Sequence, residues 1–336
     1  MSQKAHSRIM GIGHHLPPRV MTNFDIMEVI ETSDEFIVER TGVRERRWAD
    51  PELSASDLAV EACKEAVADA GLEMDDIDLV ILNTITPDHA DPGCAFFLQG
   101  KLGIGHVPAM DVRQQCAGLI YGLSIADHFV RAGTYRHVLV VCSEVLSKRI
   151  DGSYDGRNIA ILLGDGAGAV VVGPAEDPDR GVLSTILHAD GTGAEALYTA
   201  APGSGLGRTE HITKEDIDEG RVHFRMDGGA VFENGVSRMS GVLFESLEAN
   251  GLSLDDIDVL IPHQANLRML EAIVEKVAID QEKVFVNVEN FGNMASACLP
   301  IAIYQAREQG MLTEGKLVQL VAFGSGFVWG SALLRW

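Results

Sequence analysis

The chain of 336 residues is long enough for two domains or one large one, and a hydrophobic share of 46% excludes wholesale disorder. A net charge of −22, from 27 Lys and Arg against 49 Asp and Glu, argues against nucleic-acid binding because such a surface repels phosphate backbones. Five cysteines without a CxxC pair argue against a disulfide scaffold or structural zinc site, and no signal peptide or membrane span is expected, so the composition indicates the cytoplasm.

The first part of the chain predicts a helix at 57–70, a strand at 79–83 and an apolar helical run that starts at Cys116. In the first turn of that helix, backbone N–H groups and the helix dipole would stabilise a thiolate. The pKa of the Cys116 thiol would then fall, and the residue would serve as a nucleophile. The alternative is a buried structural cysteine, which is our interpretation of the other four: Cys63, Cys94, Cys142 and Cys298.

Strands are predicted at 137–144 and 169–173, and the second overlaps the end of the glycine-rich segment GDGAGAVVV at 164–172. We interpret its glycines as a turn, and they match the loose pattern G-x-G-x-x-A. A dinucleotide site requires such glycines to open a helix, whereas a strand follows here, so a nicotinamide oxidoreductase is the weakest interpretation. No P-loop and no G-x-S-x-G elbow occur. Residues 174–235 lack a regular pattern and are interpreted as a loop-rich connection.

A helix at 236–250 and a strand at 259–263 follow, and the strand ends at His263. The carboxyl ends of strands in α/β sheets are where sites assemble, so His263 is a candidate proton donor or acceptor. The alternative is a histidine that caps the next helix. Asn293 is predicted at the start of a later helix, nearly in the place that the first half gives to Cys116. Its amide would be a hydrogen-bond donor, or alternatively an ordinary N-cap.

The chain ends with predicted strands at 317–324 and 331–336, separated by a second glycine-rich turn. The tight turn Gly324-Ser325-Gly326 is suited to presenting backbone N–H groups to an oxyanion.

The chain contains an internal repeat, because AGLEMDDIDLVILN at 70–83 returns as NGLSLDDIDVLIPH at 250–263, an offset of 180 residues. Each copy is preceded by a helix and followed by a strand, a polar turn and a helix. We therefore predict two similar α/β halves: residues 1–173 carry the cysteine, and residues 174–336 carry the histidine and asparagine.

Four motifs in this order closely resemble the β-ketoacyl-acyl carrier protein synthase III family of the thiolase superfamily: CAG at 116–118, HQAN at 263–266, GN at 292–293 and GSGFVWGSALLRW at 324–336. The segment TSDEFIVERTGVRERR at 32–47 and the GDGAGA sequence are similar to that family too. The resemblance runs from about residue 8 to the end of the chain. It implies a five-layered αβαβα fold made of two duplicated halves, and a homodimer.

The resemblance also implies a reaction. An acyl group from acyl-CoA is loaded on Cys116, and malonyl-acyl carrier protein then loses CO2 and attacks the thioester. His263 and Asn293 would hold the malonyl thioester carbonyl, and the N–H groups of Cys116 and Ser325 would form the oxyanion hole. No metal or organic cofactor is implied, since the coenzyme A thioester is a substrate.

Further residues are implied for binding. Those that would line the mouth of the site and contact the adenine and phosphates of coenzyme A are Thr32, Phe36, Arg40 and Arg157. Those along its pantetheine arm would be Phe232 and Asn266, and Arg268 with Lys276 would form a basic patch for an acidic carrier protein. Ordinary exposed charge is the alternative for these basic residues.

The sequence departs from the family pattern at several positions: Phe36 replaces a usual Trp, Gln115 a small Ala, Gly229 an Asn, Met294 a Thr, Ser325 a Gly, and Asp91 an apolar residue near the partner's acyl pocket. Ser325 changes nothing if only its N–H acts, and the other departures leave the acyl substrate and the donor open. Two alternatives on the same fold remain: an acyltransferase or head-to-head acyl-CoA condensing enzyme, and a non-catalytic ketosynthase-like subunit. The second need not keep the Cys, His and Asn that this chain has.

Overall fold

Two β-sheets form the framework of the chain in a computed structural model that describes residues 7–154 and 156–336. The first sheet has the strand order β1-β7-β6-β4-β5, and the second has the order β11-β12-β13-β8. The strands of the first are β1 (Ser7–His15), β4 (Leu79–Asn83), β5 (Ala109–Val112), β6 (Val138–Val145) and β7 (Asp165–Pro174). Those of the second are β8 (Gly181–Ala189), β11 (Val259–Pro262), β12 (Leu317–Gly324) and β13 (Val328–Arg335).

The two sheets repeat one topology. In the first, β4 runs parallel to β6, which pairs antiparallel with β7, which pairs antiparallel with β1. In the second, β11 runs parallel to β12, which pairs antiparallel with β13, which pairs antiparallel with β8. The predicted duplication is therefore present in the fold, and the chain crosses from one sheet to the other between Pro174 and Gly181.

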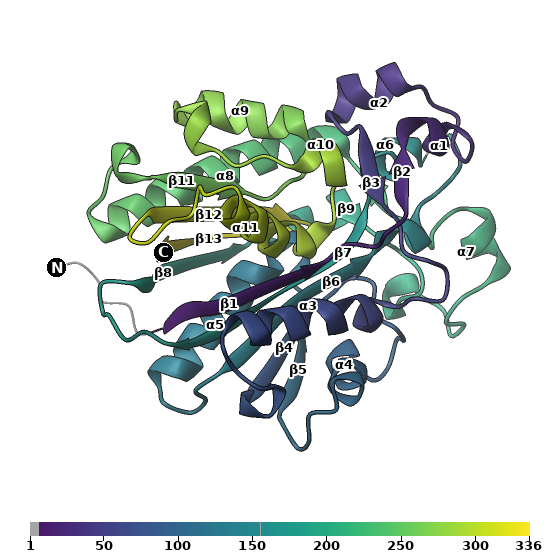
Figure 1. Cartoon of the computed structure of the whole chain (residues 1–336). Helices are drawn as coiled ribbons and strands as arrows, with labels where there is room; N and C mark the ends of the chain where they lie inside the picture. Colours follow the sequence, from purple (N-terminus) through teal and green to yellow (C-terminus); the bar gives the residue numbers. More distant parts are fainter. Residues whose placement is uncertain (1–6, 155) are drawn as a thin grey trace.

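Helices form three layers around these sheets (Figure 1). The layer outside the first sheet contains α3 (Ala55–Asp69) and α4 (Cys94–Leu102), and the layer outside the second contains α8 (Gly228–Asn250) and α9 (Leu267–Val277). Between the sheets lie α5 (Gly118–Arg131) and α11 (Cys298–Glu308). Helix α5 contacts β6 and β7 on one side and β8 and β13 on the other. The predicted five-layered αβαβα, thiolase-like fold is confirmed.

Burial on both faces explains the composition of the central elements. All eight residues of β6 are buried, which is why this strand reads as a continuous apolar run. Small residues allow α5 to lie close to the sheet: a Cβ added at Gly122 would come within 2.4 Å of Val140 Cγ1. The candidate catalytic residues predicted at the ends of these elements are therefore held in place by a tightly packed interior.

The remaining elements are short and lie mainly at the end of the sandwich near α10 in Figure 1. They are β2 (Val20–Thr22), α1 (Asn23–Met27), α2 (Asp34–Thr41), β3 (Glu45–Arg47), α6 (Arg157–Ala160), β9 (Leu197–Tyr198), α7 (Lys214–Asp218), β10 (Arg225–Met226) and α10 (Val288–Phe291). Arg46 ties this region to the body of the protein, because its buried guanidinium donates to Asn23 Oδ1 at 2.8 Å and to the Ile161 carbonyl at 2.7 Å.

Three expectations about elements were wrong. Gly166 and Gly168, interpreted as part of a turn, lie in β7, where Gly168 leaves room for Pro300 of α11; the strand predicted at 169–173 is confirmed as the second half of β7. The region 174–235 is not merely a connection, since it supplies β8 and the start of α8. Strand β1 was missed because its glycines obscure the strand pattern; they admit α3, and a Cβ at Gly11 would lie 2.3 Å from the Ala66 carbonyl oxygen.

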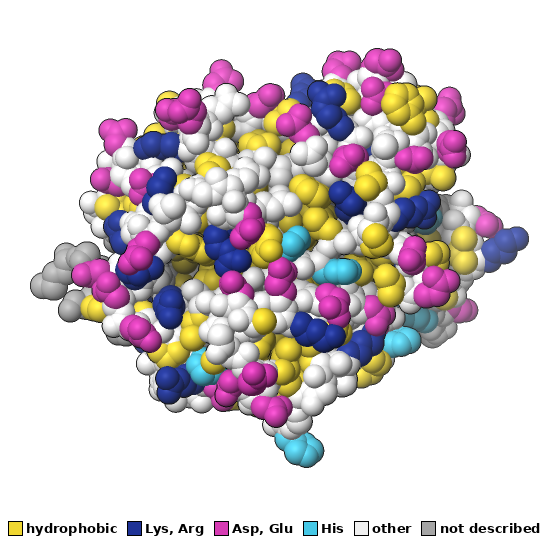
Figure 2. Space-filling view, in the orientation of Figure 1, with side chains coloured by type: hydrophobic (Ala, Val, Ile, Leu, Met, Phe, Trp, Pro, Cys, Tyr) yellow, Lys and Arg dark blue, Asp and Glu magenta, His cyan; other side chains and the backbone are white. Residues whose placement is uncertain are grey.

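Two further features concern the exterior. Acidic and basic side chains are interspersed over the face shown in Figure 2, with apolar residues between them. Across the residues that the structure describes, none of the helices combines the length and the apolar character needed to cross a membrane.

Candidate active site

Cys116 lies in a single turn of 3-10 helix, Gln115–Ala117, between β5 and α5. The turn begins with Gln115 in the left-handed region, at φ 50°. Asn83, the last residue of β4, holds the turn, because its Oδ1 accepts from Gln114 N at 2.8 Å and its Nδ2 donates to the Gln115 carbonyl at 3.3 Å. Gly118 is required at the start of α5, since a Cβ there would come within 2.2 Å of the Asn83 side chain.

The second half contains a matching turn, Ala295–Ala297, which is followed by α11 at Cys298. It also begins with a left-handed residue, Ala295, at φ 44°. The residue in the place of Cys116 is therefore Ser296, and Asn293 lies three residues earlier. The expectation that Asn293 starts a helix in nearly the same place as Cys116 needs this correction.

Asn293 is fixed between the two halves. Its N–H donates to the Leu162 carbonyl at 2.7 Å, and its carbonyl accepts from Gly164 N at 3.0 Å. Its side-chain Oδ1 accepts from Ala295 N at 2.8 Å. The N-cap of α11 is Ala297, so Asn293 does not act as the cap of that helix.

His263 follows β11 and is 2% exposed. Its backbone N–H donates to the Val321 carbonyl at 2.8 Å, while its ring Nδ1 has no hydrogen-bond partner among the described residues. Burial lowers the pKa of the imidazole to about 4, so the ring is neutral at neutral pH. The cap of the following helix is Asn266, whose Oδ1 accepts from Met269 N at 2.8 Å, which removes the capping interpretation of His263.

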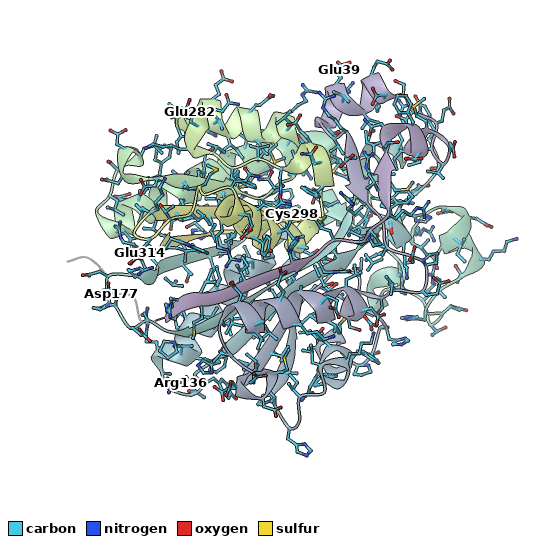
Figure 3. All side chains as sticks on the ribbon, in the orientation of Figure 1. Glu39, Arg136, Asp177, Glu282, Cys298 and Glu314 are labelled. Atoms are coloured by element: carbon cyan, nitrogen blue, oxygen red, sulfur yellow. The ribbon has the colours of Figure 1, made fainter. Side chains whose placement is uncertain are left out.

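The segments that carry these three residues meet between the sheets. The turn of Cys116 contacts the turn of Ser296, and Cys116 packs with Ala295 in one apolar cluster. The sulfur of Cys298 lies 3.8 Å from Asn293 Oδ1 and 3.8 Å from the carbonyl oxygen of Gln264, the residue after His263. Figure 3 shows Cys298 in the middle of the molecule. A cysteine interpreted as merely structural thus lies within the site.

The expected lowering of the Cys116 pKa was wrong. Desolvation raises the pKa of its thiol well above the ordinary value, and the nearby Cys298 and Glu144 raise it further. Helix α5 begins only at Gly118, two residues after the thiol. Burial therefore outweighs the stabilisation that a helix N-terminus gives to an anion, and the resting thiol is protonated.

Glu144 is a fully buried carboxyl at this junction that the sequence reading missed. Its Oε2 accepts from Ile85 N at 3.0 Å and from Thr86 Oγ1 at 3.1 Å, and its Oε1 accepts from Ser296 Oγ at 2.5 Å. Desolvation raises the pKa of the carboxyl to about 7 despite these bonds. An acidic residue at the end of the apolar strand 137–144 was the signal that could have indicated it.

The turn between β12 and β13 packs directly on the cysteine. A Cβ added at Gly324 would lie 2.8 Å from Cys116 N. Ser325 and Gln115 line a cavity of about 840 Å³ beside this turn. The structure thus brings both residues of the predicted oxyanion hole to the same place.

Three of the four residues predicted at the mouth also come together. The Arg157 guanidinium lies 4.7 Å from the centroid of the Phe36 ring, and that of Arg40 lies 5.6 Å from it. The hydroxyl of Thr32 is buried, without a hydrogen-bond partner among the described residues. An aromatic ring beside two guanidinium groups is suited to a base and its phosphates.

The other predicted binding residues are more dispersed. Phe232 is 37% exposed on α8, and the side-chain oxygen of Asn266 is occupied by its capping bond. Arg268 and Lys276 are exposed on α9, but Glu271 and Glu275 lie between them on the same helix, so the patch has mixed charge.

Comparison with known protein families gives two matches along the chain. Residues 110–191 match the model of 3-oxoacyl-[acyl-carrier-protein (ACP)] synthase III, and residues 247–336 match the model of its C-terminal part.

Similar proteins carry consistent names. A beta-ketoacyl-[acyl-carrier-protein] synthase III of Caldanaerobacter subterraneus is 42% identical over 336 residues, which cover 100% of this chain and 99% of the relative. One from Xanthomonas campestris is 43% identical over 337 residues and covers 100% of both chains. The Aquifex aeolicus synthase III structure is 39% identical with a TM-score of 0.88, covering 98% of this chain and 100% of the other. An OleA structure from Xanthomonas campestris, 22% identical with a TM-score of 0.86 over 100% of both chains, shares the fold.

Proposed function

The chain belongs to the 3-oxoacyl-[acyl-carrier-protein] synthase III family, and we propose that it performs the family's condensation with Cys116 as nucleophile and His263 and Asn293 as its partners. It is an acyl-transferring condensing enzyme. The observation that supports the residue assignment is the meeting of three segments from both halves at one buried junction: the turn of Cys116 contacts the turn of Ser296, and Cys298 lies against Asn293 and against the carbonyl oxygen of Gln264, the residue after His263.

In the first step, Cys116 Sγ attacks the carbonyl carbon of an acyl-CoA thioester. A new S–C bond forms, the bond to the coenzyme A sulfur breaks, and the N–H groups of Cys116 and Ser325 hold the oxyanion. Because burial raises the pKa of the Cys116 thiol, a base must take its proton during the attack. Neutral His263, with an unpartnered ring nitrogen, is suited to this role and then returns the proton to the departing thiolate.

In the second step, malonyl-acyl carrier protein takes the place of coenzyme A. Asn293 and neutral His263 donate hydrogen bonds to its thioester carbonyl, so that the enolate left by loss of CO2 is stabilised. The carbanion attacks the acyl-Cys116 carbonyl, the C–S bond breaks, 3-oxoacyl-carrier protein leaves, and the released Cys116 thiolate takes up one proton from solvent to return to the resting thiol. The low pKa of His263, about 4, keeps the imidazole neutral and its single N–H available as a donor.

The remaining assignments belong to the same proposal. No metal or organic cofactor takes part, the enzyme is a cytoplasmic homodimer, and residues 1–173 and 174–336 are its two halves. Coenzyme A binds at Thr32, Phe36, Arg40, Arg157, Phe232 and Asn266, and the carrier protein docks on Arg268 and Lys276. The guanidinium groups of Arg157 and Arg40 beside the Phe36 ring support the assignment of the coenzyme A site.

Two measurements test the function. The intact mass after incubation with acyl-CoA should rise by one acyl group in the wild type and in Cys63→Ala, a buried cysteine of α3 outside the site, but not in Cys116→Ala. His263→Ala and Asn293→Ala should lose CO2 release from malonyl-acyl carrier protein. An acyl adduct that persists in Cys116→Ala would disprove the nucleophile, and acyl transfer without any CO2 release would indicate an acyltransferase instead.

A further inference from the structure

The side chains that line the cavity beside Cys116 bear on which acyl group the enzyme accepts. Ile85 and Phe224 line this cavity and also belong to the apolar cluster in which Cys116 packs. Ser325 and Gln115 lie at the same end. An acyl chain attached to Cys116 therefore has this cavity next to it. The residues that line the cavity would contact the end of the chain that is remote from the thioester.

Arg149, the last residue of the 3-10 helix Leu146–Arg149, is fixed in the wall. Its Nη1 donates to the Ile85 carbonyl at 2.9 Å, and its guanidinium carbon lies 4.6 Å from the centroid of the Phe224 ring. Ile85 and Phe224 pack against the same apolar cluster as Cys116. The guanidinium therefore lies beside the cluster that holds the nucleophile, with further N–H donors left for a ligand.

A second arginine lines the same cavity. Arg113 follows β5; burial lowers the pKa of Arg149, and the charge of Arg113 lowers it further. Within residues 7–154 and 156–336, neither arginine has a carboxylate within salt-bridge distance. Two like charges on one wall repel each other, and an anion between them would relieve that repulsion.

The acidic groups nearby are already engaged. Asp88 also lines the cavity, but its carboxylate accepts from Ser56 and Cys94 and lies 3.6 Å from Lys101 Nζ. Glu144 has its oxygens bonded within the protein, as described above. The charge of Glu144 partly offsets that of Arg113 at Arg149, but neither carboxyl forms an ion pair with the two arginines among the described residues.

We propose that the acyl group loaded on Cys116 ends in a carboxylate, so that the primer is the coenzyme A thioester of a dicarboxylic acid held at its free end by Arg149 and Arg113. This inference rests on the proposed function and specifies its substrate. The guanidinium fork matches a carboxylate in two parallel hydrogen bonds. The transfer is balanced: the thioester carbonyl moves from the coenzyme A sulfur to Cys116 Sγ, coenzyme A leaves as a thiol, and the distal carboxylate is unchanged.

The test compares pairs of primers of equal size. Succinyl-CoA is set against isocaproyl-CoA, and glutaryl-CoA against isoheptanoyl-CoA, in which an isopropyl end replaces the carboxylate. Acylation rates are followed by intact mass. The wild type should load the acidic member of at least one pair about ten-fold faster or more, as a charge-assisted hydrogen bond implies. Arg149→Gln and Arg113→Gln should each reduce this ratio.

The ratio within each variant serves as an internal control for folding, because both primers meet the same protein. Arg136→Gln, an exposed arginine outside the cavity, should keep the wild-type ratio. If the wild type loads the neutral primers as fast as the acidic ones or faster, the inference is overturned and the proposed function stands. The same holds if Arg149→Gln and Arg113→Gln both keep the wild-type preference for the acidic primers. A failure to load these four primers would overturn the inference alone if acetyl-CoA still loads Cys116, and the proposed function as well if acetyl-CoA also fails.

Discussion

Glu144 links the two halves at the scale of a single side chain. It extends from β6 of the first half and accepts a hydrogen bond from Ser296, the residue that the second half has in the place of Cys116. Because the group is fully buried, its ionisation is opposed, and its pKa rises from 4.5 to about 7. A group whose pKa differs between the folded and unfolded chain makes stability depend on pH.

The sign of that dependence follows from the raised pKa. Below the pKa of 4.5 in the unfolded chain, the Glu144 carboxyl is protonated in both states. Between that pH and the folded-state pKa of about 7, only the unfolded chain ionises, so the folded state loses stability as the pH rises. The loss is on the order of 3 kcal/mol. Glu144→Gln mimics the protonated form and should not show it. Urea unfolding of both proteins between about pH 4 and pH 8 measures the difference.

The control is Glu61→Gln on the exposed surface of α3, where loss of a surface ion pair changes the unfolding free energy by less than about 1 kcal/mol. A Glu144→Gln protein whose stability follows the wild type at every pH would contradict the raised pKa.

Residue type next to a predicted element led to Cys116 and His263 as candidates, because a reactive residue follows a strand or precedes a helix there. Glu144 and Cys298 also stand at or near element ends, but only the fold shows that they lie at this junction, because their hydrogen bonds there include partners more than thirty residues away in the chain. The direction of the Cys116 pKa was wrong for the same reason, since desolvation depends on the surrounding fold.

At the scale of elements, the β12–β13 turn and the Cys116 turn pack so closely that each restricts the backbone conformation of the other. Gly324 allows the approach, and an added Cβ would come within 2.9 Å of Gln115 Cβ as well as close to Cys116 N. Distances under 3.0 Å are not tolerated between such atoms, so one of the turns would have to move. The oxyanion N–H groups proposed for Cys116 and Ser325 depend on this contact.

We expect Gly324→Ala to slow acylation of Cys116 by about ten-fold or more, because misplacing an oxyanion donor has effects of this size or larger. The rate of adduct formation by intact mass measures this effect. Gly241→Ala is the matched control: Gly241 lies in α8 with nothing within 4 Å of an added Cβ. It should leave acylation unchanged and raise the unfolding free energy by about 1 kcal/mol. Equal acylation rates in both variants would show that the turn does not position the donors.

Element prediction succeeded where hydrophobic pattern and burial agree. The strands β4, β6, β11 and β12 were found because they are buried on both faces and read as apolar runs. Strand β1 was missed because Gly11 and Gly13 break its pattern for the sake of α3. Where close backbone packing requires glycine, the apolar pattern by which a strand is recognised in the sequence is interrupted.

At the scale of the whole molecule, the halves are interlocked rather than adjacent. Helices α5 and α11 lie between the sheets, and α11 also bonds to α3 through Tyr304 to Glu65 at 2.8 Å and Arg307 to Asp69 at 2.5 Å. Neither sheet can keep both faces covered without the other half. Unfolding should therefore be one cooperative transition.

The three tryptophans report on different halves, since Trp48 lies in the first and Trp329 and Trp336 in the second. A variant that keeps only Trp48 and one that carries Trp48→Phe should each show a single fluorescence transition in urea. The transition midpoint of each should match that of its own circular dichroism signal. Two separated transitions in either protein would show that the halves unfold independently.

The left-handed residues Gln115 and Ala295 stand at the same position of the two related turns, although only one turn carries a thiol. A non-glycine residue in this conformation costs on the order of 1 kcal/mol or more, and the chain tolerates that cost twice. The two turns contact each other, so the paired left-handed bend belongs to their mutual packing, and the thiol is a property of only one of them.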